Sequence, residues 1–153
     1  MKAIGYKENL PIEDENSLQD IELNTPKATG KDILVEIKAI SVNPADYKVR
    51  AGMPVEGDEW KVIGWDATGI VKEVGEEVTL FKAGDEVWYA GDFTRQGSYA
   101  QYQIVDERIV GKKPTSLSFP EAAALPLTSL TAYEMLFDRL QVSKDDASKS
   151  ILV

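Results

Sequence analysis

The chain has 153 residues, of which 43% are hydrophobic and 28% are charged, so it is long enough to form one globular domain with a sizeable core. Its 17 basic and 26 acidic side chains give a formal charge of -9. This balance disfavours nucleic acid as a partner, because affinity for phosphate depends on clustered cations. Cysteine and histidine are both absent, which excludes disulfide bonds, thiol nucleophiles, serine–histidine triads and zinc sites built from nitrogen and sulfur ligands.

From the sequence we expect no segment that directs the chain to a membrane. No apolar run approaches the roughly 18 residues of a membrane span. No apolar signal segment precedes Glu8. We therefore expect a soluble, cytoplasmic protein without a membrane partner.

Residues 1–113 have the pattern of an antiparallel β structure. In residues 33–40, Glu36 and Lys38 alternate with apolar side chains, which is the period-2 pattern of a half-buried strand. Three further short apolar runs are predicted as strands, over residues 69–74, 86–90 and 99–105. Short strands about 8–12 residues apart, separated by glycine turns, favour a barrel or sandwich over a βαβ array. We predict a mainly β fold with flanking helices.

An alanine-rich segment after residue 119 predicts a short helix followed by a longer one. Apolar side chains then recur every three or four positions, the pattern of an amphipathic helix, at Leu127, Leu130, Tyr133, Leu136, Phe137 and Leu140. Proline suits the first turn of a helix but kinks an interior, so Pro126 is expected to begin the second helix. Residues 145–150 are predicted to be a polar turn or a short helical piece. Residues 151–153 look like the beginning of a strand, which needs about five or six residues, so we expect a fragment of a longer protein.

Several residues suit either a ligand cleft or an ordinary structural role. Asn43 is held extended by Pro44, so its amide either caps the following turn or donates to a ligand. Asp46 either favours the dipole of a short helix and pairs with Arg50, or belongs to a cleft. The glycines of residues 64–69 suit a barrel corner or a cofactor cleft.

The remaining candidates are aromatic, cationic and hydroxyl side chains. Trp65 either forms the wall of a cleft or fills the core. Tyr47 carries a phenol that can donate a hydrogen bond or relay a proton, and Lys48 can supply positive charge. Thr128 and Thr131 lie three residues apart on one helical face. By themselves these threonines indicate ordinary contacts between helix and barrel.

Four segments resemble, in order, the medium-chain dehydrogenase/reductase superfamily. They contain SVNPADYKVRAG, IGWDATGIV continuing to GDEV, GSYAQY, and AAALPLTSLTAYE, at residues 41–52, 63–87, 97–102 and 122–134. The Asn-Pro-x-Asp form resembles the zinc-independent quinone oxidoreductase-like branch. The resemblance implies a GroES-like barrel catalytic domain over residues 1–120 and a helical connection over residues 121–149. Residues 150–153 would begin a Rossmann domain whose remainder is missing.

The resemblance also bears on zinc. Where zinc-dependent relatives carry cysteine, His-Glu and a further cysteine, this sequence has Asn43, Trp65–Asp66 and Leu127. A short loop at residues 91–97 stands where such relatives hold a cysteine-rich lobe with structural zinc. Without cysteine or histidine we expect no zinc and no other metal at the site.

The resemblance implies roles for eight residues. The predicted catalytic residues are Asn43, Tyr47 and Lys48. The predicted substrate-binding residues are Trp65 and Asp66. The predicted cofactor-binding residues, beside the nicotinamide, are Asn43, Asp46, Thr128 and Thr131. In some quinone oxidoreductases a tyrosine stands where this sequence has Lys48.

These observations predict an NADPH-dependent oxidoreductase that transfers hydride to a quinone or an α,β-unsaturated carbonyl. Donors such as Asn43 and Tyr47 would stabilise negative charge on the acceptor oxygen. NADPH would be bound mainly by the missing domain, so the fragment is expected to be inactive, and the full-length protein is expected to be a homodimer. The alternative is a stand-alone GroES-like binding or interaction module without chemistry. A zinc alcohol dehydrogenase is disfavoured by the composition.

Overall fold

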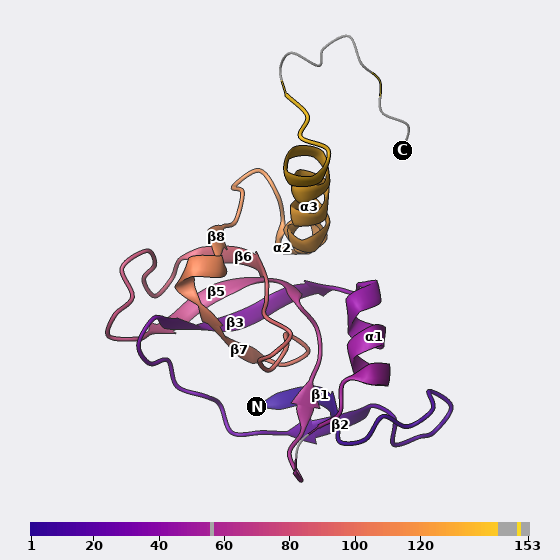
Figure 1. Cartoon of the computed structure of the whole chain (residues 1–153). Helices are drawn as coiled ribbons and strands as arrows, with labels where there is room; N and C mark the ends of the chain where they lie inside the picture. Colours follow the sequence, from indigo (N-terminus) through magenta and orange to yellow (C-terminus); the bar gives the residue numbers. More distant parts are fainter. Residues whose placement is uncertain (56, 144–149, 151–153) are drawn as a thin grey trace.

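The structure is a computed structural model that describes residues 1–55, 57–143 and 150 (Figure 1). The strands are β1 (Lys2–Tyr6), β2 (Gln19–Glu22), β3 (Asp32–Ser41), β4 (Lys61–Val62), β5 (Asp66–Val74), β6 (Glu86–Ala90), β7 (Tyr102–Asp106) and β8 (Gly111–Lys112). The α-helices are α1 (Pro44–Gly52), α2 (Phe119–Ala123) and α3 (Pro126–Tyr133). A short 3-10 helix, η1 (Glu107–Ile109), and a π-helical segment, η2 (Glu134–Arg139), complete the described elements.

The strands form two antiparallel sheets. The larger sheet has five strands in the order β7-β3-β5-β6-β8, and the smaller has three in the order β2-β1-β4. The main core lies inside the larger sheet, where the fully buried Ile33, Val35 and Val87 pack together. A second cluster, formed by Tyr6, Ile63 and Trp65, lies beneath α1 side chains. The expected mainly β fold with flanking helices is confirmed.

The predicted strands occur with shifted boundaries. The run at residues 86–90 coincides with β6, and β3 adds one residue at each end of the run at 33–40. The strand predicted over residues 99–105 is shorter, because β7 begins only at Tyr102. The carbonyl oxygen of Tyr99 accepts from the Ile4 N–H at 2.7 Å, so the chain contacts the smaller sheet before it joins the larger one. The alternation of side chains continues through this crossing, although the strand partner changes.

The helices begin where the sequence predicts. Pro126 is the first residue of α3, and α2 ends before it. Ser118 and Glu121 form a capping box at the start of α2. Beyond Tyr133 the winding changes from α to π in η2, so the amphipathic pattern does not continue as a regular α-helix. None of the described helices is both long enough and apolar enough to cross a membrane.

The C-terminal predictions are mostly untested by the structure. Except for Ser150, the turn predicted at residues 145–150 and the strand predicted at residues 151–153 lie outside the described residues.

Figure 1 shows α3 leading away from the barrel on the side of β6 and β8. The side chains that would form a site therefore come from one end of the larger sheet and from the start of α3.

Candidate functional site

The candidate site begins at the corner between β3 and α1. β3 ends at Ser41, α1 begins at Pro44, and Asn43 lies between them in an extended conformation. The backbone N–H of Asn43 donates to Asp46 Oδ2 at 2.7 Å, and the Asp46 N–H donates to the Asn43 carbonyl at 2.9 Å. These reciprocal bonds close the first turn of α1, which also benefits from an acidic residue at its positive end.

Asp66 connects this corner to α3. It is the first residue of β5 and is fully buried. Its Oδ2 accepts from Asn43 Nδ2 at 2.8 Å, and its Oδ1 accepts from the backbone N–H of Leu127 at 2.8 Å. The Asp66 carboxylate thus joins three elements that are distant in the sequence.

The environment of Asp66 affects its ionisation in opposing ways. Burial raises the pKa of the Asp66 carboxyl, and the nearby charge of Asp46 adds to this increase. The hydrogen bonds from Asn43 and Leu127 lower the pKa but do not overcome burial. The site therefore contains a carboxylate whose charge is costly and is supported by two donors.

Asp46 is bonded to a tyrosine and not to the arginine considered from the sequence. Tyr99 Oη donates to Asp46 Oδ2 at 3.0 Å. Arg50 instead donates through Nη1 to the Leu10 carbonyl at 2.9 Å. Within the described part of the chain, Asp46 Oδ1 is buried and has no hydrogen-bond partner. Burial and the adjacent Asp46 charge raise the pKa of Tyr99, which keeps its phenol protonated as a donor.

Asn43 uses its amide nitrogen within the protein. Nδ2 donates to Asp66, and its second contact is with the Ser41 carbonyl at 3.5 Å. The Asn43 amide nitrogen is therefore not free to donate a hydrogen bond to a ligand in this arrangement. Asn43 itself is 9% exposed, at the limit of burial.

Trp65 fills the core. Its side chain is 3% exposed and belongs to the cluster with Tyr6 and Ile63. Its Nε1 has no hydrogen-bond partner among the described residues. The structure thus agrees with the structural alternative for Trp65, while contact with a substrate stays a prediction. The same is true of Asp66, whose two oxygens are already bonded and whose side chain does not reach the surface.

The other predicted site residues are exposed. Tyr47 and Lys48 lie on the first turns of α1, and Tyr47 is 60% exposed. Thr128 and Thr131 lie on the exposed side of α3, and their hydroxyls donate to the Leu125 and Leu127 carbonyls at 3.1 and 2.9 Å. The catalytic and cofactor-binding roles of these residues stay predictions.

Sequence reasoning did not single out Tyr99 as a site residue. Two features of the sequence could have pointed to Tyr99: the segment GSYAQY, which contains it, and Gly64. Gly64 has a φ of +97°, and a Cβ atom there would collide with the Tyr99 ring. Glycine is required at this position both for its backbone conformation and for the approach of Tyr99. The participation of the Leu127 backbone N–H has no signal in the sequence, because every residue except proline carries one.

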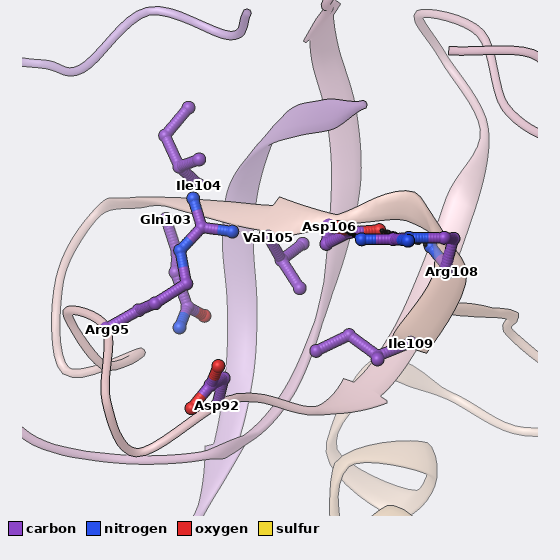
Figure 2. A pocket seen from close by; sticks show the side chains of 8 residues that line it. All are labelled: Asp92, Arg95, Gln103, Ile104, Val105, Asp106, Arg108 and Ile109. Carbon is purple, nitrogen blue, oxygen red and sulfur yellow. Dashed lines mark hydrogen bonds and ion pairs between the residues drawn. The ribbon is translucent and has the colours of Figure 1, made fainter. Parts of the chain in front are cut away.

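Two cavities lie away from the Asn43 corner. Figure 2 shows one of about 370 Å³ beside β7, where Arg95 and Arg108 project near Asp92 and Asp106. Arg108 is paired with Asp106, and Arg95 is paired with Asp32. The other cavity, of about 310 Å³, lies between α3 and β6 and has a largely apolar lining. Neither cavity is lined by the predicted site residues.

The donor set does not suit zinc. Among the described residues there is no group of three or more acidic, histidine or cysteine side chains that could hold a metal ion. At the three positions that resemble zinc-ligand positions, Asn43 and the Leu127 N–H both donate to Asp66. An amide nitrogen is not a metal ligand and the Leu127 side chain offers none, so this corner has only oxygen atoms where zinc sites typically use cysteine and histidine.

Known proteins show the family of the chain. The sequence profile of the alcohol dehydrogenase GroES-like domain matches residues 29–115. The chain belongs to this family. Over its whole length, the chain is 41% identical to a zinc-type alcohol dehydrogenase-like protein of Staphylococcus epidermidis, of which it spans 46%. It is also 41% identical over its whole length to 2-methylene-furan-3-one reductase of Solanum lycopersicum, of which it spans 40%.

Solved structures have the same fold. A Rhizobium etli CFN 42 protein, provisionally assigned as a zinc-dependent alcohol dehydrogenase, is 60% identical with a TM-score of 0.90, and the match covers 94% of this chain and 42% of that one. The Escherichia coli quinone oxidoreductase complexed with NADPH is 31% identical with a TM-score of 0.75, over 89% of this chain and 40% of that one. The chain therefore spans less than half the length of these relatives, and its family is one of oxidoreductases.

Proposed function

We propose that this GroES-like domain is the catalytic half of an NADPH-dependent oxidoreductase that reduces a quinone or an α,β-unsaturated carbonyl without zinc. The observation that carries the proposal is the direct bonding of Asn43 and the Leu127 N–H to Asp66. These groups occupy the positions that resemble zinc-ligand positions, and they satisfy one another. Without zinc to polarise the acceptor oxygen, protein groups would have to stabilise the charge that develops there, while a nicotinamide cofactor would supply the hydride.

The names of the relatives support the substrate class. One relative is a 2-methylene-furan-3-one reductase, which acts on a conjugated ketone, and one solved structure is a quinone oxidoreductase with NADPH. A quinone and an enone both place negative charge on an oxygen when they accept hydride. A site for either acceptor therefore needs a donor or a cation beside that oxygen.

NADPH supplies the hydride when it is bound. On this chain we propose that Asn43, Asp46, Thr128 and Thr131 contact its nicotinamide end. The exposed threonines fit that role, because a ribose or carboxamide offers both donors and acceptors. The Asp46 carboxyl is buried, so its part in this contact stays a prediction from the sequence. The phosphates would be held by the part of the protein that relatives have beyond this domain. We therefore propose that the 153 residues alone do not turn over.

Charge on the acceptor oxygen would be stabilised from α1. The Asn43 N–H groups are directed to Asp66 and Ser41, which leaves Tyr47 and Lys48 as the exposed donor and cation of the corner. We propose that these two side chains bind the oxygen and that either Tyr47 or solvent returns the proton. The homodimer and the cytoplasmic location stay predictions.

The test is the combined change Asn43→Ala and Tyr47→Phe in the complete protein, with NADPH and a panel of quinones and enones. We expect the hydride-transfer rate to fall about 100-fold, as for the loss of one positioned donor. The control is Tyr102→Phe, a change of the same type on β7 and away from the corner. The isolated 153-residue chain is expected to show no turnover. An unchanged rate in the double variant would show that this corner is not the site.

A further inference from the structure

Asp66 is unusual among the buried side chains because both of its oxygens bond to segments that carry predicted site residues. Oδ2 holds Asn43, three residues before Asp46 and four before Tyr47. Oδ1 holds the N–H of Leu127, next to Thr128. The partners are 23 and 61 residues from Asp66 in the sequence, so neither contact follows from local structure.

We propose that Asp66 is a positioning residue that fixes the spacing between the α1 corner and the first turn of α3. In this proposal Asp66 acts through these two segments and not by contact with the reactants, in place of the substrate-binding role that the sequence predicted. It holds Tyr47 and Lys48 on one side, and Thr128 on the other, at the separation that an acceptor and a nicotinamide require. The catalytic consequence rests on the proposed function.

The chemistry of the side chain explains why a carboxylate stands at this position. Two donors converge on it, and an ionised carboxylate offers two acceptor oxygens and no donor. An asparagine would keep one acceptor but turn an NH2 group toward either Asn43 or Leu127, so one of the two bonds would be lost. A buried charge seldom adds stability compared with well-packed apolar groups. Its presence here therefore favours a positioning role over a purely stabilising one.

Thr68 provides a matched comparison. It lies on the same strand two residues after Asp66, is also fully buried, and its Oγ1 donates to the Phe119 carbonyl at 2.9 Å. It thus ties β5 to the start of α2, but it contacts neither Asn43 nor Leu127. Thr68→Val removes this bond and the longer contact of Oγ1 with the Ala39 carbonyl at 3.4 Å, without touching the two segments that Asp66 joins.

The first measurement needs no variant and no activity. In isotope-labelled chain, NMR is expected to detect scalar coupling across hydrogen bonds from the Leu127 amide nitrogen and from Asn43 Nδ2 to the Asp66 carboxyl carbon. Both couplings should persist in Thr68→Val. Absence of either coupling in the folded wild type would overturn the proposal.

The second measurement uses the complete protein with NADPH and the best acceptor of the panel. Asp66→Asn is expected to lower kcat about 10-fold to 100-fold, the range for a displacement of roughly an ångström, with the acceptor KM changed less than about threefold. Thr68→Val should keep kcat within about twofold of the wild type, even if it lowers the melting temperature as much as Asp66→Asn does. Equal losses of kcat in the two variants would overturn the positioning role.

The two measurements separate the two proposals. If the wild type reduces no quinone or enone, the proposed function is wrong, and the couplings still decide whether Asp66 joins the two segments. If the wild type is active and Asp66→Asn is equally active, the positioning role is wrong and the proposed function stands. If Asp66→Asn does not fold, the couplings in the wild type decide whether Asp66 joins the two segments, and their absence overturns the proposal.

Discussion

Carboxylates in this domain respond to pH in opposite directions according to their surroundings. Arg108 donates to both oxygens of Asp106, at 2.9 and 2.6 Å, and these bonds lower the pKa of Asp106 to about 2. Burial instead raises the pKa of Asp66. Asp106 therefore favours the folded state above its ordinary pKa and loses this effect as the pH falls toward 2. Asp66 favours the folded state at low pH, and its contribution is lost as the pH rises through its raised pKa.

The Asp106 pair gives a prediction for acid stability. Arg108→Gln is expected to lower the free energy of unfolding at pH 6, because the ionised Asp106 loses its partner. The difference from the wild type should become smaller near pH 2, because about half of the wild-type Asp106 is protonated when the pH equals its pKa of about 2. Urea unfolding at the two pH values measures this. The control is Lys82→Gln, since the Lys82 side chain is in no ion pair among the described residues. The same difference at both pH values would contradict the prediction.

Among the elements, strands β3 and β5 approach each other closely at Gly69. A Cβ atom on this residue would collide with the Glu36 carbonyl and the Val35 side chain. The register of the pair shifts nearby, between Ile37 and Ala39. The close approach of the two backbones therefore requires glycine, because the partner is main chain and cannot move aside.

Two alanine substitutions compare a crowded glycine with an open one. Gly69→Ala is expected to lower the free energy of unfolding by about 1–3 kcal/mol, the range for overpacking, because β5 must separate from β3. Gly52→Ala, at the end of α1, has no atom within 4 Å of the added Cβ. This substitution should leave stability unchanged or raise it by up to about 1 kcal/mol. Urea unfolding of both variants provides the measurement, and equal effects would contradict the role of Gly69.

The sequence predicted elements better than their partners. Alternation identified β3 and β6 because one face of each strand is buried, and Pro126 marked the start of α3 because proline lacks an N–H. The change to π-helical winding in η2 carried no comparable signal. The residues before Tyr102 kept an alternating pattern although Tyr99 and Gln101 bond to β1 of the smaller sheet.

For the whole molecule, the main exposed apolar surface lies on α3 and η2. We call it the α3 face; its large side chains, each about half exposed or more, are Leu130, Tyr133, Met135, Phe137 and Leu140. The rings of Tyr133 and Phe137 lie 4.8 Å apart. Relatives are more than twice as long as this chain. An apolar surface of this kind favours association when nothing covers it.

The isolated chain is therefore expected to self-associate as its concentration rises. Combining Leu130→Gln with Phe137→Gln should return it to a monomer at the same concentration, as measured by light scattering. Ile12→Gln is the control, because Ile12 is 62% exposed but lies in the N-terminal loop away from the α3 face. A chain that stays monomeric at high concentration, or association that Ile12→Gln also abolishes, would contradict this role of the α3 face.

The sequence by itself determined the mainly β class, the start of α3, the absence of thiol and imidazole chemistry, and the positions of Asn43 and Asp66 in family-like segments. These features depend on composition or on neighbours within a few residues. Only the tertiary structure decided that Asp66 joins Asn43 to Leu127, that Tyr99 bonds to Asp46, and that Trp65 is core. Such contacts depend on how separate strands and helices pack, and local side-chain patterns carry no record of that packing.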